Sequence, residues 1–147
     1  MIVQFIFASL SAVGFAYIFN VKEKIVWAAA FIGGIVWIFY LISMKFGISL
    51  GVTFFILGAI CTFGSEIIAR VFKTPVTSAL IPTITPIVPG SGAYYAVFYL
   101  FNGQHDLAMQ KAMDTFVMTG SMILGFLIAS DLVKLYIKIK TKKSKNK

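Results

Sequence analysis

Five long apolar runs, separated by short polar breaks, make up most of the chain. The runs cover residues 2–20, 25–44, 48–69, 76–101 and 115–137. Each can cross a bilayer as an α-helix, because about 20 apolar residues span the hydrocarbon core. The breaks are too short for a soluble domain and require antiparallel neighbours. The pattern therefore predicts an all-α integral membrane bundle of five transmembrane helices in a single transmembrane domain, residues 1–137.

The fourth run differs from the others because prolines and glycines interrupt it. Within eleven residues it contains three prolines, Pro82, Pro86 and Pro89, and two glycines, Gly90 and Gly92. A proline lacks the amide hydrogen and clashes with the carbonyl four residues earlier. Irregular backbone at membrane depth persists only where protein or a water-filled cavity satisfies it. The motif predicts a broken fourth helix of the kind that forms transporter substrate sites, with a simple packing kink as the alternative.

The order of residues in this motif predicts which charge each end would bind. Ser91 is a suitable N-cap for a resumed helix, so the N–H groups of residues 90–92 would point into the break and attract a carboxylate. The upstream carbonyls, with the hydroxyls of Thr83 and Thr85, would receive an ammonium group. An amino acid carries both charges, whereas a dicarboxylate would use the amide end twice or need a basic partner. The candidate substrate-binding residues are Thr83, Thr85, Pro86, Pro89, Gly90, Ser91, Gly92 and Tyr94.

Composition and charge support a membrane protein and predict its orientation. Of the 147 residues, 59% are hydrophobic and only 12% are charged, against about 25% charged in soluble domains. The net charge is +8, and with five spans eleven of the 13 basic residues fall on one side of the membrane. Because Lys and Arg near helix ends are retained in the cytoplasm, we expect the N-terminus outside and a basic cytoplasmic tail at residues 138–147. Clustering of seven lysines in residues 134–147 favours contact with the lipid bilayer and argues against nucleic acid.

The sequence contains no recognisable enzymatic motif. His105 is the only histidine and lies in the polar break at residues 102–114, where a solvated loop residue is expected. The single cysteine, Cys61, allows neither an intrachain disulfide nor a cysteine-based metal site. No nucleotide-binding motif is present, so any transport is expected to depend on an ion gradient. We therefore expect no enzyme activity, no catalytic residue, no cofactor and no metal.

Two pairs of opposite charges lie near the ends of predicted helices. Glu66 and Arg70 are four residues apart and share a helix face at the predicted cytoplasmic end of the third run. One interpretation is an interfacial salt bridge that anchors the helix. The other is that the pair serves gating or proton coupling, with Glu66 as the titrating carboxylate. Asp131 and Lys134 form a similar pair in the fifth run, where anchoring is the stronger interpretation.

Several of these motifs resemble the threonine/serine exporter family. The most specific is the Pro-Ile-Val-Pro-Gly sequence at residues 86–90, followed by Tyr94 four residues after the glycine. Many family members have a proline directly after an Asn-Val pair, where this chain has Lys22, a departure that affects a loop and leaves the motif intact. The other matches extend the resemblance over residues 14–95: Gly14-Phe15-Ala16, Phe19-Asn20-Val21, Gly33-Gly34, Glu66, Ala69-Arg70 and Pro75.

The resemblance implies the small subunit of a two-subunit exporter in the cell (inner) membrane, equivalent to the C-terminal half of the fused exporters. It also implies a larger membrane partner and export of threonine and serine, or of dicarboxylates such as succinate. The expected function is a secondary exporter subunit for small carboxylate-bearing metabolites, with the broken helix lining the path. The rival expectation is a non-transporting structural subunit that stabilises a larger partner.

Overall fold

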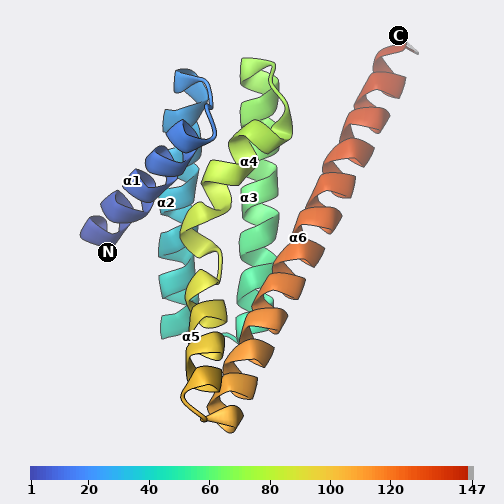
Figure 1. Ribbon diagram of the computed structural model, residues 1–147. Helices are drawn as coiled ribbons and strands as arrows, with labels where there is room; N and C mark the ends of the chain where they lie inside the picture. The colour runs from blue at the N-terminus through green and yellow to red at the C-terminus, as the bar shows by residue number, and fades with distance from the viewer. Residues whose placement is uncertain (146–147) are drawn as a thin grey trace.

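The computed structural model describes residues 1–145, with side chains described through residue 140. In this part of the chain the structure is all-helical, as predicted (Figure 1). The elements are α1 (Ile2–Ile18), α2 (Glu23–Lys45), α3 (Leu50–Phe72), α4 (Val76–Ile84), the 3₁₀ turn η1 (Thr85–Ile87), α5 (Gly90–Phe101) and α6 (His105–Lys145).

Among the described residues, three helices are long and apolar enough to cross a membrane, namely α2, α3 and the part of α6 at His105–Lys140. The apolar segments Ile2–Ile18 and Val76–Ile87 are shorter, so the count of five spans stays a prediction. α6 has 41 residues and is about 60 Å long at 1.5 Å per residue, which exceeds a hydrocarbon core of about 30 Å. It continues past residue 137 to Lys145, so the predicted basic tail begins as an extension of the helix, while residues 146–147 lie outside the described part.

The central helix is α3, which packs against α2, α4 and α6. Glycines bring α3 and α6 into backbone contact: a Cβ on Gly58 would collide with the Met122 carbonyl, and one on Gly125 with the Phe55 carbonyl. Close approach through small residues is the usual way that helices associate in membranes. The main buried apolar cluster joins four elements and consists of Val36, Phe54, Leu57, Cys61, Ile87 and Met122.

Small residues also hold the amino-terminal half together. Ala8, Ala12 and Ala16, spaced four apart, are the buried residues of α1. On α2, a Cβ added to Gly33 would lie 3.4 Å from both the Ala12 Cβ and the Pro86 Cγ. Gly33 therefore lets α1 and η1 approach the same point of α2, which fixes where the chain can turn between α4 and α5.

The structure corrects the predicted polar break at residues 102–114. α5 ends at Phe101 and α6 begins at His105, so His105 is the first residue of a helix and not a loop residue. Gly103 turns the chain with φ of +73°, a conformation that glycine adopts without strain. Asp106 lies in the first turn of α6, where negative charge is favourable, and Ala108 is buried. From His105 onward, the polar residues of this segment lie on a helix instead of in a loop.

The loops gather at two ends of the molecule. In Figure 1 the α1–α2 and α3–α4 connections lie at one end, and the α2–α3 and α5–α6 connections lie at the other. α6 leaves α3 as it runs toward the C-terminus, which opens a groove between them on the first of these ends. At the opposite end α5 and α6 form a hairpin beside α3, and the cavity described below lies there.

Candidate functional site

The backbone changes direction between α4 and α5. α4 contains Pro82 and ends at Ile84, η1 follows as a single tight turn, and α5 begins at Gly90. The Val88 amide still donates to the Ile84 carbonyl at 3.2 Å. Whether the two halves cross the membrane as one broken span stays a prediction, but helical hydrogen bonding is interrupted at the positions where the prolines remove donors.

Two threonine hydroxyls stabilise the end of α4. Thr83 Oγ1 donates to the Ala79 carbonyl at 2.7 Å, and Thr85 Oγ1 donates to the Ile81 carbonyl at 3.0 Å. The Thr83 side chain is fully buried. Both hydroxyls are thus committed to their own helix, and the Thr83 carbonyl additionally accepts a 4.0 Å contact from the Cys61 thiol.

The first turn of α5 leaves backbone amides available. The Gly90 amide donates to the Val88 carbonyl at 2.7 Å, and the Ala93 amide donates to the Pro89 carbonyl at 3.4 Å. Between them, the amides of Ser91 and Gly92 have no backbone acceptor among the described residues, as expected for the start of a helix. The N-cap is Pro89 and not Ser91, whose side chain lies within the first turn. The predicted helix start is therefore two residues too late, because Pro89 precedes the helix without any side-chain cap.

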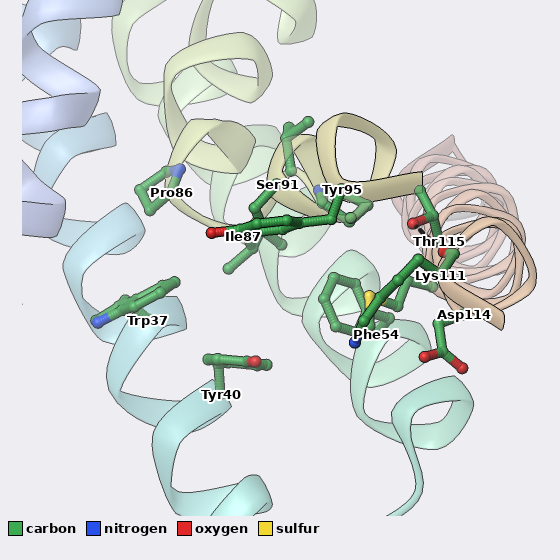
Figure 2. A pocket seen from close by; sticks show the side chains of 14 residues that line it. Trp37, Tyr40, Phe54, Pro86, Ile87, Ser91, Tyr95, Lys111, Asp114 and Thr115 are labelled. Carbon is green, nitrogen blue, oxygen red and sulfur yellow. Dashed lines mark hydrogen bonds between the residues drawn. The ribbon is translucent and has the colours of Figure 1, made fainter. Parts of the chain in front are cut away.

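A cavity of about 380 Å³ lies beside this turn. Figure 2 shows it between α2, η1, α5 and α6, with Lys111 and Asp114 entering from α6 on the side opposite Trp37 and Tyr40 of α2. The cavity is lined by Trp37, Tyr40, Phe54, Pro86, Ile87, Val88, Pro89, Ser91, Gly92, Tyr95, Lys111, Asp114, Thr115 and Met118. Its volume falls within the range of small-molecule sites, about 300–1,000 Å³.

The structure brings together half of the predicted substrate-binding residues. Those that line the cavity are Pro86, Pro89, Ser91 and Gly92. Those outside its lining are Thr83, Thr85, Gly90 and Tyr94. Tyr95 lines the cavity where Tyr94 was expected. The two side chains differ because adjacent residues on a helix point in directions about 100° apart.

Sequence reasoning missed the side of the cavity that α6 provides. Lys111, Asp114 and Thr115 all line it, yet the prediction assigned the first two to a loop. Their spacing of three and four residues would have placed them on one helix face, had the helix been extended back to His105. Thr115 Oγ1 donates to the Lys111 carbonyl at 2.7 Å, and it is also the group that a Cβ on Gly92 would strike.

The α2 and α3 side of the cavity is aromatic. The rings of Trp37 and Tyr40 have centroids 5.2 Å apart, and those of Tyr40 and Phe54 are 5.9 Å apart. Aromatic faces attract cations, with Trp the strongest. No signal in the sequence connected these residues to the proline motif, because their proximity depends on how α2 and α3 pack around η1.

Glu66 and Arg70 do not belong to this cavity. The Arg70 Nη2 lies 2.8 Å from the Glu66 Oε2, and Arg70 Nη1 donates to the Glu66 carbonyl at 2.8 Å. The Glu66 side chain is 10% exposed and that of Arg70 is 45% exposed. Both line the groove between α3 and α6, whose cavity measures about 630 Å³ and whose other lining residues are Phe63, Ile67, Leu132, Val133, Tyr136, Ile137 and Lys140.

Within residues 1–145 no group of three or more His, Cys, Asp and Glu side chains is placed to hold a metal ion. A family model described as "Threonine/Serine exporter, ThrE" matches residues 4–132. The chain has no match among curated proteins or among solved structures.

Proposed function

We propose that this chain, which belongs to the threonine/serine exporter family, is a subunit of a secondary exporter whose substrate passes through the α5 cavity. The family is a family of transporters and not of enzymes. The substrates proposed are small carboxylate-bearing metabolites, either threonine and serine or dicarboxylates such as succinate. The observation that carries the proposal is the 380 Å³ cavity at the α4–α5 interruption.

The cavity has the features that a carboxylate site needs. The amides of Ser91 and Gly92 start a helix and lack backbone acceptors in the described structure, so they are donors on the positive end of the α5 dipole. Interrupted helices supply such donors in transporters of other folds. A carboxylate at this turn would replace the water that these amides otherwise need.

The proposed location is the cell inner membrane, with the N-terminus outside and the C-terminus in the cytoplasm. Lys22 and Lys24, Arg70 and Lys73, and the basic end of α6 all belong to the end of the molecule that carries the α3–α4 connection. The rule that basic residues stay inside assigns that end to the cytoplasm. The α5 cavity then lies in the outer half, and the groove with Glu66 lies in the inner half.

We propose that a larger exporter subunit completes the assembly as a hetero-oligomer. α5 contains no buried residue, and among the described elements it packs on α6 alone. Its outer face carries Tyr94 and Phe98, stacked with ring centroids 6.2 Å apart and both exposed. This face also supports the alternative function, a non-transporting structural subunit in which the partner contains the whole path.

Glu66 and Arg70 are proposed as the gating or proton-coupling pair on the cytoplasmic side. The Glu66 carboxylate is 10% exposed and is held by one guanidinium, that of Arg70, so gating would require this pair to break. The alternative is that this pair only anchors α3 at the interface, as exposed or interfacial ion pairs commonly do.

The proposed function is tested by efflux from cells preloaded with labelled threonine, serine or succinate. Gly92→Val places a branched side chain against Thr115 and into the cavity, so efflux should fall at least tenfold. Ala93→Val is the matched control on the next residue, which is exposed and outside the cavity lining, and it should retain efflux. Membrane levels of both variants are measured alongside. Full efflux by a correctly inserted Gly92→Val variant would favour the structural subunit.

A further inference from the structure

We propose that Lys111 and Asp114 are the residues by which the α5 cavity recognises substrate charge. Lys111 binds the carboxylate and Asp114 binds the ammonium group of a zwitterionic α-amino acid. This inference rests on the proposed function, because it takes the α5 cavity as the substrate site. Both side chains are half-buried and line the cavity from the same face of α6.

Lys111 and Asp114 lie near the start of the long helix α6. Lys111 is six residues inside the start of α6, which corresponds to about 9 Å along the axis. They belong to the His105–Lys140 helix, which contains a stretch apolar enough to span a membrane. Ionisable residues within such segments are rare, and they either pair with one another or mark substrate and ion pathways.

Lys111 and Asp114 do not pair with one another. The ion pairs of the described residues are Arg70 with Glu66 and Lys134 with Asp131. Asp131 and Lys134 have the same three-residue spacing and do close, at 3.3 Å. In that pair the acid precedes the base, which is the favourable order on a helix, whereas in Lys111 and Asp114 the order is reversed. The two charges beside the cavity are therefore left for a ligand.

The charges around the cavity match one class of ligand. Lys111 and Asp114 are the two charged side chains in its lining. The remaining lining residues are aromatic, apolar or hydroxyl-bearing. An α-amino acid carries one negative and one positive group on a single carbon, so each finds an opposite charge. A dicarboxylate would place its second negative group near Asp114, which is a like-charge contact that disfavours binding.

The aromatic wall reinforces this assignment. Trp37 and Tyr40 lie across the cavity from α6 (Figure 2), and their faces stabilise a cation that is released from water. An ammonium group at Asp114 therefore enters a cavity whose opposite wall is aromatic. The carboxylate gains from Lys111 and from the free amides at the start of α5, which lie on the same cavity.

Tryptophan fluorescence of the purified full-length chain tests the assignment. The chain has two tryptophans, and Trp27 is exposed and outside the cavity, so a Trp27→Phe background leaves Trp37 as the reporter. Threonine should produce a saturable change, and succinate should bind at least tenfold more weakly. Asp114→Asn should weaken threonine binding at least tenfold but leave butyrate, which has only a carboxylate, unchanged. Lys111→Gln should weaken both ligands.

Matched variants separate charge recognition from structural damage. Asp131→Asn removes the same charge from α6 far from the cavity and should leave every affinity unchanged. Lys111→Arg and Asp114→Glu retain charge and should retain the preference for threonine over succinate. These two variants provide the test if a neutral variant fails to fold. The proposal is overturned if succinate binds as tightly as threonine, or if no ligand produces a saturable change. It is also overturned if Asp114→Asn binds threonine as tightly as Asp114→Glu does.

Failure of this proposal is distinguishable from failure of the proposed function. If Gly92→Val blocks efflux and Asp114→Asn leaves threonine affinity unchanged, the role of Lys111 and Asp114 in substrate recognition is rejected and the exporter function is supported. If substitutions of Lys111 and Asp114 change threonine affinity but Gly92→Val leaves efflux unchanged, substrate recognition by the pair is supported and the transport path is rejected.

Discussion

Glu66 with Arg70 on α3, and Lys111 with Asp114 on α6, are both opposite charges within about one helical turn, yet they differ in state. The first pair is closed at 2.8 Å with a nearly buried carboxylate. The second pair is not joined by an ion pair within the described structure, and both of its members line the α5 cavity. The two pairs also lie at opposite ends of the bundle, beside separate cavities.

The difference indicates different roles for the same chemistry. The two charges of a closed pair neutralise each other, so the pair can contribute to stability. It can also act as a gate, but only if the ion pair first breaks. An open pair beside a cavity keeps its charges available for a ligand at little conformational cost. Order along the helix contributes to the difference, because acid before base favours closure.

The largest expected effect is on stability at the closed pair. Arg70→Ala leaves the Glu66 carboxylate, 10% exposed, without its partner, and should lower the free energy of unfolding by about 1–3 kcal/mol. Lys111→Ala removes no ion pair and should change it by less than about 0.5 kcal/mol. Denaturant unfolding of the purified protein measures both. Equal losses for the two variants would remove the distinction between closed and open pairs.

Reversing the open pair should close it. The double variant Lys111→Asp with Asp114→Lys places the acid before the base, which adds about 0.2–0.5 kcal/mol of helix stabilisation. Threonine affinity, measured through Trp37 fluorescence, should fall about tenfold because the charges now satisfy each other. Unchanged affinity would mean that the cavity does not select through these two side chains.

The smallest expected effect concerns pH. Glu66→Gln removes the carboxylate of the closed pair while keeping its shape, so if the pair couples protons the pH dependence of efflux should flatten while the maximal rate changes little. Efflux is compared with the unsubstituted chain across a series of external pH values. A profile that keeps its original shape would assign Glu66 and Arg70 to anchoring α3.

The interruption of the fourth apolar run could be predicted from the sequence because its cause is covalent. Proline removes a backbone donor wherever it occurs, so Pro82, Pro86 and Pro89 predict where α4 must lose helical hydrogen bonds. The family could also be identified from the sequence, since the resemblance rests on the same short motif. The family model that matches residues 4–132 confirms it.

The opposite walls of the cavity could not be predicted in the same way. Lys111 and Asp114 were hidden by the assumption that a polar stretch after Asn102 was a loop, whereas its polar residues lie along α6. Trp37 and Tyr40 belong to a different helix, and their approach to Pro86 depends on close packing at Gly33. Such contacts arise from tertiary packing and leave no periodic signal near the motif.

The position of the helix start matters for the same reason. The N-cap is Pro89 and not Ser91, and Tyr95 and not Tyr94 lines the cavity. An error of one or two residues at a helix end is ordinary, but at a binding site it changes which side chain a substrate would meet.

A substrate path through the α5 cavity is tested most directly by the reactivity of a cysteine at Ser91, which lines the cavity and is exposed. A membrane-impermeant thiol reagent is added outside intact cells that carry Ser91→Cys, with Ala93→Cys as the control outside the cavity. The native thiol of Cys61 is buried and should not react. If substrate passes through this cavity, Ser91→Cys is modified, and threonine slows this reaction but not that of Ala93→Cys. No modification at Ser91→Cys, or a rate that threonine does not change, would contradict a substrate path through this cavity.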